Sequence, residues 1–271
     1  MTMPEWSWIG ACATGTSHAR EELPCDDAGA CVEVPTSNGA ALVAVVSDGA
    51  GSASMSRYGS AMVTRSFCQS VTAHLRDGGR AADIDEALAG DWLDAMRDRI
   101  ARRAGLLQDI PRSFAATLVG VIVERHLTVV VHVGDGACAL RLAGEAGWRV
   151  PSWPAQGEYA STTYFVTDDP QPRVSISRIE GSVEEVAVFT DGMERLALDF
   201  AGHCAFDRFF ESLFPALRKA SPGRQRALST HLRDFLDSER VTERTDDDKT
   251  LVMARRAIAR HAGPGVLAYG R

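Results

Sequence analysis

Three apolar runs in this chain each end in an aspartate followed by a glycine. They are the segments VAVVSDG, VVVHVGDG and EVAVFTDG, which end at Asp48-Gly49, Asp135-Gly136 and Asp191-Gly192. Each run has the length and composition of a buried β-strand. A single Asp-Gly pair after a strand indicates only a turn. Three together constrain the fold more strongly, because strands that end at one edge of a sheet bring their carboxylates together.

Two further acidic clusters lie near predicted strand ends. Asp26-Asp27 occurs in PCDDAG, and Asp246-Asp247-Asp248 precedes the apolar run that begins at Leu251. Carboxylates gathered at one edge repel each other by roughly a few kcal/mol unless cations neutralise them. An oxygen-only ligand set favours Mg²⁺ or Mn²⁺. Two such ions about 4 Å apart commonly activate water for attack on a phosphoester.

The remaining pattern predicts an α+β chain. We expect strands at 6–13, 29–34, 40–47, 114–124, 127–133, 137–142, 163–167, 173–179, 186–190 and 250–254. We expect helices at 54–75, 84–104, 206–219 and 224–238, and an irregular flap at 151–162. The first helix would turn Tyr58, Met62, Phe67 and Val71 toward the core. Strands followed by helices, twice, with hairpin connections, predict antiparallel sheets covered by helices.

Composition excludes several classes of protein. The net charge of −7 provides no basic field for nucleic acid or anionic lipid. No apolar run approaches the roughly 20 residues that span a bilayer, and the N-terminus lacks a signal-peptide pattern. The six cysteines form no CxxC pair, so we expect reduced thiols and a cytoplasmic protein. Without internal repeats, we expect a single domain over 1–271, with a core at about 5–255 and a tail at 256–271.

The motifs, taken in order, resemble those of a known family. They are GTSH at 15–18, PCDDA at 24–28, SDGAGS at 47–52, SFAATLVG at 113–120, VGDGACALR at 133–141, GEYASTTYF at 157–165, FTDGMERL at 189–196 and DDKTLV at 247–252. Together they resemble the metal-dependent type 2C protein phosphatases, the PPM family of Ser/Thr phosphatases. The most similar branch is bacterial and opens with a GTSH…PCxDA segment. The resemblance covers nearly the whole chain and implies a four-layer αββα sandwich, with metals in a cleft at one end.

The resemblance also implies a ligand set for two Mn²⁺ or Mg²⁺ ions. Asp48 would bridge both ions and the Gly49 carbonyl would bind one of them, which explains why glycine follows the carboxylate. Asp191 and Asp247 would hold the other ion. Asp247 is preferred to Asp248 because the family pattern D-[ND]-x-[ST] fits residues 247–250, although the alignment can slip by one residue.

Three more carboxylates have places in this scheme. Asp27 matches the acidic residue of the family's first motif. Asp26 occupies the neighbouring position, which can bind a metal directly or through water. Asp135 matches a position associated with a third, weaker metal. By resemblance, Asp48 and the cations would activate a bridging water as hydroxide for direct attack on phosphorus, without a phosphoenzyme.

The groups that contact the substrate phosphate are less well defined by the sequence. His18 is a candidate general acid or phosphate contact, or else a solvated surface residue. Many family members carry an Arg five residues before the Asp of the first motif, where this chain has Glu22. Arg20 can serve instead, or it is simply an exposed charge.

Three functions remain open at this point. The first is a protein phosphatase acting on phosphoserine and phosphothreonine, with a Ser/Thr kinase or its targets as partners, as a monomer without nucleic acid or membrane. The second is a catalytically weak relative that acts as a regulatory or binding module, which Glu22 slightly favours. The third is a Ca²⁺-binding structural protein, although no acidic run has the regular ligand spacing of an EF-hand loop.

Overall fold

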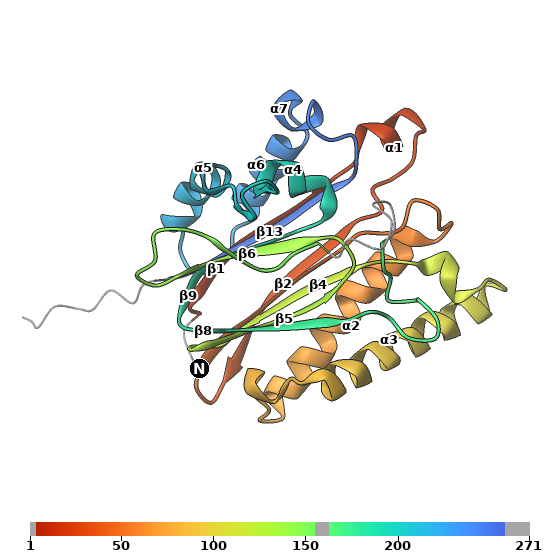
Figure 1. Ribbon diagram of the computed structural model, residues 1–271, viewed down its shortest axis with the longest axis horizontal. Helices are drawn as coiled ribbons and strands as arrows, with labels where there is room; N and C mark the ends of the chain where they lie inside the picture. Colours follow the sequence, from red (N-terminus) through yellow and green to blue (C-terminus); the bar gives the residue numbers. More distant parts are fainter. Residues whose placement is uncertain (1–3, 155–162, 258–271) are drawn as a thin grey trace, which may run out of the picture.

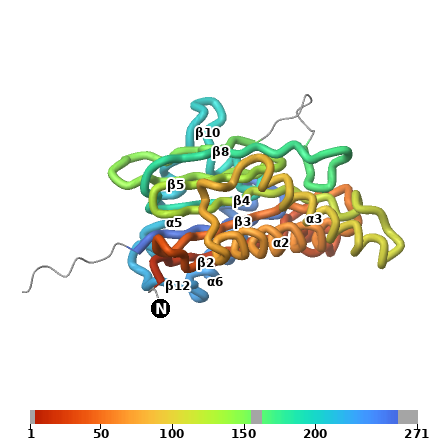
Figure 2. Tube along the Cα trace, turned by 90° about the horizontal axis from the view of Figure 1, so that it is seen from below, coloured from red at the N-terminus to blue at the C-terminus, as the bar shows by residue number. Residues whose placement is uncertain are grey.

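Two β-sheets pack face to face in the computed structural model, which describes residues 4–154 and 163–257 (Figures 1 and 2). The first sheet has the order β12-β1-β13-β9-β6-β7, with β1 Trp6–Ala13, β6 Ala137–Leu142, β7 Arg149–Ser152, β9 Val183–Phe189, β12 Gly223–Arg224 and β13 Lys249–Arg256. The second has the order β2-β3-β4-β5-β8, with β2 Ala28–Thr36, β3 Gly39–Ser47, β4 Leu118–Val123, β5 Leu127–Val133 and β8 Ser175–Glu180. All neighbours are antiparallel except β1 and β12. A small separate ribbon pairs β10 Leu198–Asp199 with β11 Cys204–Ala205.

Helices cover the outer faces of both sheets (Figure 1). The long helices are α2 Ser56–Arg76 and α3 Glu86–Leu106 on the five-stranded sheet, and α5 Asp207–Arg218 and α6 Arg226–Leu236 on the six-stranded sheet. The short elements are α1 Thr16–Arg20, α4 Glu194–Ala197, α7 Glu239–Thr242 and the 3₁₀ turns Ala81–Asp83, Pro111–Phe114 and Asp191–Met193. The expected four-layer αββα sandwich is therefore confirmed.

The strand β3 shows why the sequence forms these layers. Its residues from Ala40 to Ser47 are all buried, because helices cover one face of the sheet and the second sheet covers the other. Val43 and Val45 pack toward α2 and α3, whereas Leu42, Ala44 and Val46 pack between the sheets. The side chains alternate between two apolar environments, so the strand reads as a continuous hydrophobic run rather than an alternating one.

Some predicted elements differ from the observed ones. Residues 163–167 form no strand, and Val166 N–H instead donates to the Ala116 carbonyl at 2.9 Å. The strand expected from 114 begins at Leu118, because Pro111–Phe114 forms a 3₁₀ turn with proline near its start. In the predicted flap, Pro151 and Ser152 end β7, while 155–162 lie outside the described residues.

The inward face of α2 was also partly mispredicted. Tyr58 is 54% exposed, and Met62 is only partly buried. The face that packs on the sheet instead follows Gly59, Val63, Phe67 and Val71, with a spacing of four residues. Pattern reading missed its start because glycine has no side chain to register as apolar. Gly59 lies so close to the Phe114 carbonyl that an added Cβ would be 2.1 Å from its oxygen.

Two predictions about the chemistry of the chain can be compared with the structure. All six cysteines are free thiols, as expected. Within 4–154 and 163–257, no helix is both long enough and apolar enough to cross a membrane.

An ion-pair cluster joins the six-stranded sheet to α5. The Glu185 carboxylate on β9 is buried and accepts hydrogen bonds from Arg218 Nε at 2.7 Å and Nη2 at 2.9 Å. Arg141 Nε lies 2.8 Å from Glu185 Oε2. Glu185→Gln is expected to lower the free energy of unfolding by about 2 kcal/mol, because a hydrogen bond to a charged group contributes roughly 1.5–3 kcal/mol. Urea unfolding of the metal-free protein measures this.

The matched control is Glu180→Gln, at the exposed end of β8. It should change stability by less than about 0.5 kcal/mol, as surface substitutions usually do. Equal losses in the two variants would contradict a stabilising role for the Glu185 cluster.

Candidate metal centre

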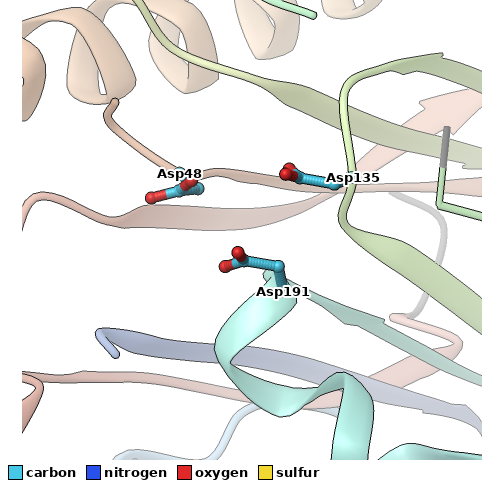
Figure 3. A group of neighbouring side chains, drawn as sticks. All are labelled: Asp48, Asp135 and Asp191. Carbon is cyan, nitrogen blue, oxygen red and sulfur yellow. The ribbon is translucent and has the colours of Figure 1, made fainter. Parts of the chain in front are cut away.

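The three strand-end aspartates of the sequence meet in space. Asp48 directly follows β3, Asp135 lies in the turn between β5 and β6, and Asp191 begins the 3₁₀ turn after β9. One carboxylate oxygen of each lies within 4.8 Å of those of the other two. Figure 3 shows the three side chains pointing toward a common space between the sheets. Asp48 thus comes from the end of the five-stranded sheet, Asp191 from the end of the six-stranded sheet, and Asp135 from the connection between the two sheets.

Backbone hydrogen bonds hold Asp48 at the end of its strand. Asp48 N–H donates to Thr117 Oγ1 at 2.9 Å, and Thr117 N–H donates to the Asp48 carbonyl at 2.8 Å. Ser47 Oγ donates to the Thr117 carbonyl at 2.6 Å. Thr117 is buried just before β4 begins at Leu118, and it fixes the backbone of the central carboxylate. A Cβ at Gly49 would lie 2.7 Å from the Asp26 carbonyl oxygen, so the backbone needs glycine there.

Crowding and burial strongly favour the protonated form of these carboxyl groups. Burial, followed by the charges of Asp27 and Asp191, holds the pKa of Asp48 well above its ordinary value. Burial also raises the pKa of Asp27 to about 7. Burial and the charges of Asp135 and Asp247 raise the pKa of Asp191 to about 8. In the absence of cations, the group cannot carry all its negative charges at neutral pH.

The donor atoms suit a hard divalent cation. Oδ1 of Asp27 and Oδ1 of Asp135 are buried and have no hydrogen-bond partner among the described residues. Every candidate ligand is a carboxylate or carbonyl oxygen, which is the set that Mg²⁺ and Mn²⁺ prefer. Bound cations would satisfy the unpartnered oxygens and remove the repulsion, so the residues fit the expected metals.

The first acidic motif lies against this group. Asp27 is 8% exposed, its charge helps to raise the pKa of Asp48, and its Oδ2 accepts a hydrogen bond from Thr190 Oγ1 at 2.7 Å. The Asp26 carboxylate accepts from Ser56 Oγ at 2.6 Å, at the start of α2. Asp27 therefore belongs to the interior of the site, and Asp26 to its wall beside α2.

The triple aspartate at 246–248 divides into two roles. Asp248 is 2% exposed, and its carboxylate accepts from Gly15 N–H at 2.6 Å and Asp26 N–H at 2.5 Å, with His18 Nδ1 3.0 Å away. Asp247 lies outside the Asp48 trio, yet its charge raises the pKa of Asp191 and of Asp135. Its Oδ1 accepts from Asp248 N–H at 2.8 Å. The charge of Asp247 therefore acts on the carboxylates of the metal centre, while the carboxylate of Asp248 binds the first motif.

The first motif ends in a tight turn. Leu23 N–H donates to the His18 carbonyl at 2.9 Å and Glu22 N–H to the Ala19 carbonyl at 3.3 Å, the two bonds of a Schellman motif. Glu22 takes the left-handed position of that motif, with φ 58°, where glycine is usual. Both Glu22 and Arg20 are exposed, and the Arg20 side chain has no hydrogen bond or ion pair with the described residues. Neither residue is fixed toward the metal centre.

His18 is held more firmly. Its partial burial lowers the pKa, but the charge and hydrogen bond of Asp248 more than offset this, so the pKa of His18 lies above its ordinary value. Sequence reasoning proposed His18 but did not find the carboxylate that binds it.

Glu194 and Thr163 were missed in the sequence. Burial and the charges of Asp191 and Asp135 raise the pKa of Glu194 to about 8, and its Oε1 is buried without a partner among the described residues. Glu194 follows Asp191 by three residues in FTDGMERL, so one helical turn places it nearby. Thr163 Oγ1 donates to Asp135 Oδ2. Thr163 lies in the segment 157–165 that resembles the family, of which 157–162 fall outside the described residues.

Comparison with known proteins agrees with this geometry. The family model described as Protein phosphatase 2C matches residues 14–237. The chain belongs to the protein phosphatase 2C family. It is 34% identical over 255 residues to Serine/threonine-protein phosphatase 3 of Escherichia coli (strain K12), covering 92% of this chain and 98% of that protein.

Solved structures of other family members share the fold of this phosphatase 2C chain. The catalytic domain of the serine threonine protein phosphatase PstP, in complex with two manganese ions, matches 94% of this chain and 100% of its own length. Its TM-score is 0.61 and its sequence identity 17%. PppA of Pseudomonas aeruginosa matches with a TM-score of 0.61 and 15% identity, over 93% of this chain and 98% of its own.

Proposed function

We propose that this protein is a metal-dependent serine/threonine-protein phosphatase, and we assign roles to its residues. The observation that carries the proposal is the convergence of Asp48, Asp135 and Asp191 within 4.8 Å, in a chain of the phosphatase 2C family. The unpartnered buried oxygens of Asp27 and Asp135 support it further. The matched relative from Escherichia coli bears the same activity in its name.

The proposed ligand set holds two Mn²⁺ or Mg²⁺ ions. Asp48 would serve both ions, the Gly49 carbonyl would bind one, and Asp191 and Asp247 would hold the other. Asp27 would belong to the same ligand set, and Asp26 would contribute directly or through water. Asp135 contributes to a third, weaker site. When bound, the pair of cations lowers the pKa of a water at the centre and neutralises charge on the substrate phosphate.

The side chains of the protein then position the attacking water and protonate the leaving group. Asp48 orients the attacking water, whose oxygen forms a bond to phosphorus as the bond from phosphorus to the seryl or threonyl oxygen breaks. His18 donates a proton to that departing oxygen, as a general acid would. Arg20 is our candidate for a contact with the phosphate. The chain has no CxxxxxR loop, so no cysteinyl phosphoenzyme is proposed.

The substrates in this proposal are phosphorylated proteins, and a Ser/Thr kinase or its targets are the natural partners. We further propose a monomeric, cytoplasmic protein with a single catalytic domain whose core spans about 5–255. The last strand ends at Arg256, whose guanidinium lies 4.8 Å from the centre of the Trp6 ring.

The experiment is turnover of p-nitrophenyl phosphate and of a phosphothreonine peptide, first with chelator and then with millimolar Mn²⁺. We expect turnover of both substrates with Mn²⁺ and none with chelator. If the protein binds Mn²⁺ but turns over neither substrate, the regulatory or binding module becomes the better interpretation. If it neither binds Mn²⁺ nor turns over either substrate, the metal centre itself is contradicted.

A further inference from the structure

The carboxylate of Asp248 gathers three donors from the first motif and is itself almost fully buried. Oδ1 accepts from Gly15 N–H at 2.6 Å, and Oδ2 accepts from Asp26 N–H at 2.5 Å and lies 3.0 Å from His18 Nδ1. The side chain is 2% exposed. A buried carboxylate needs such donors to offset the loss of water.

The turn that carries His18 is fixed by contacts that do not involve its ring. Ser17 donates twice to the Asp246 carbonyl, from N–H at 3.0 Å and from Oγ at 2.6 Å. A Cβ at Gly15 would lie 2.4 Å from the Asp247 carbonyl carbon, so the two backbones touch. Figure 1 shows α1 beside the chain that follows α7, at the same end of the sandwich. The contacts of Gly15 and Ser17 therefore fix the position of the turn. The hydrogen bond to Asp248 then determines the orientation of the imidazole ring.

The His18 ring has two distinct nitrogens in this arrangement. Nδ1 faces Asp248, whereas Nε2 has no hydrogen bond to any residue in 4–154 or 163–257. The side chain is 18% exposed, and among the described residues Nε2 is not one of the buried polar atoms, so it is accessible to a ligand. Both Asp248 oxygens already accept hydrogen bonds from backbone N–H groups, so the carboxyl group acts as an acceptor here, and an acceptor facing Nδ1 requires a proton on Nδ1. An orienting acceptor on one ring nitrogen determines which nitrogen serves the substrate.

We propose that Asp248 is a positioning residue that holds His18 with Nδ1–H toward its own Oδ2, so that Nε2 is the nitrogen that protonates the leaving seryl or threonyl oxygen. This inference rests on the function proposed above. In the step, the Nε2–H bond breaks and an O–H bond forms on the serine or threonine as its bond to phosphorus breaks. The imidazole is left neutral and regains its proton from water.

The inference predicts that the loss of activity in an Asp248 variant depends on the leaving group of the substrate. A seryl alkoxide is a poor leaving group and needs a proton during bond breaking, whereas p-nitrophenolate is a stable anion and does not. General acid catalysis contributes roughly 10²–10⁴-fold where it is needed. Loss of the His18 orientation should therefore impair peptide dephosphorylation much more than hydrolysis of p-nitrophenyl phosphate. A purely structural role for Asp248 would impair both reactions equally.

The test compares Asp248→Asn, His18→Asn and the double variant, all with Mn²⁺, on a phosphoserine peptide and p-nitrophenyl phosphate. We expect Asp248→Asn to lower kcat for the peptide by about 10²-fold and for the aryl ester by less than about tenfold. The double variant should be no worse on the peptide than His18→Asn alone, since residues that act as a unit are not additive. Ser17→Ala is the matched control, because it removes another tether of the same turn without touching the ring.

Equal losses on the two substrates, or full additivity in the double variant, would overturn the proposal. A second measurement needs no variant and no metal. In ¹⁵N-histidine spectra of the metal-free protein, at a pH where the ring is neutral, we expect His18 to carry its proton on Nδ1. A proton on Nε2 would refute the assignment even if Asp248→Asn failed to fold. Failure of the proposed function would appear differently, as wild-type protein that turns over neither substrate.

Discussion

Asp48→Asn is expected to reduce Mn²⁺-dependent turnover of p-nitrophenyl phosphate by at least about 10³-fold. Asp48 links the strand-end trio to the first acidic motif, since the charge of Asp27 helps to raise its pKa and one of its oxygens lies within 4.8 Å of Asp135 and Asp191. Removing its charge removes the proposed bridge between two cations. The loss of about 4 kcal/mol of transition-state stabilisation corresponds to 10³-fold in rate. Steady-state kinetics over a Mn²⁺ titration measures the effect.

The same variant should behave in the opposite way without metal. Replacing Asp48 by the neutral Asn takes one carboxylate out of a buried and mutually repelling group, so the metal-free variant should melt at a higher temperature than metal-free wild type. A gain of 1 kcal/mol corresponds to roughly 2–4 °C for a domain of this size. Addition of Mn²⁺ should raise the melting temperature of wild type strongly and that of Asp48→Asn little.

Asp91→Asn, an exposed aspartate on α3, is the matched control. It should keep wild-type turnover and the wild-type response to Mn²⁺. If Asp48→Asn kept more than a tenth of wild-type activity, or destabilised the metal-free protein, Asp48 would not be the charged centre of the site.

The strand-end aspartates could be predicted from the sequence because their signal is local. A buried strand must stop where its chain meets a charge, and glycine directly after the charge indicates a close backbone approach. The prediction that Asp48, Asp135 and Asp191 meet required one further assumption, namely that the three strands end on the same side of the molecule. In the structure, one carboxylate oxygen of each lies within 4.8 Å of those of the other two, although the strands belong to two sheets rather than to one.

The division of work between Asp247 and Asp248 could not be predicted in the same way. Two adjacent aspartates have the same composition and pattern, and only the register of β13 against β1 separates them. Lys249 pairs with Ala13, which brings the residues just before β13 next to the turn at 15–18. The neighbours of Asp248 are therefore Gly15, His18 and Asp26, more than 220 residues away in sequence. Long-range contacts of this kind leave no periodic signal.

Glu22 shows a different limit of sequence comparison. Counting five residues back from Asp27 assumes that the loop keeps one path, but the Schellman turn at Glu22 reverses the chain before the acidic motif. Glu22, which lies five residues before Asp27, is exposed, and the turn rather than this spacing determines where its side chain lies. Turn geometry of this kind is visible only in the backbone.

The metal-free protein is expected to lose stability as the pH rises from about 6.5 to about 8. Burial raises the pKa of Asp27 to about 7, and burial with neighbouring charges raises those of Asp191 and Glu194 to about 8. In the unfolded chain these groups ionise near pH 4. Between pH 4 and 8 the folded state therefore binds more protons than the unfolded state, so stability falls as the pH rises. For Asp27 alone, the difference between 4 and 7 corresponds to on the order of 4 kcal/mol.

A buried histidine offsets part of this fall in stability at acid pH. His132 lies between the sheets, with Nδ1 2.6 Å from Ser152 Oγ, and burial lowers its pKa to about 4. Its folded pKa lies below the unfolded value of about 6.5, so His132 makes stability fall as the pH drops from about 6.5 to about 4. The three carboxyl groups outnumber the one histidine, so the stability of the metal-free protein still falls between pH 4 and 6.5, and it falls more steeply above pH 6.5, where His132 no longer contributes. Urea unfolding with chelator at pH 5, 6.5 and 8 measures the two slopes.

The fall in stability with pH should depend on the metal centre, and the contribution of His132 should not. With saturating Mn²⁺, the cations stabilise the ionised carboxylates, so the loss of stability between pH 6.5 and 8 should disappear. Asp48→Asn, measured without metal, should reduce the same slope because one member of the group no longer titrates. His132→Gln should make the fall steeper between pH 4 and 6.5 and leave the slope above pH 6.5 unchanged. A metal-free wild type whose stability rises from pH 6.5 to 8 would mean that the carboxylates are not forced together, and the electrostatic basis of the proposed site would be wrong.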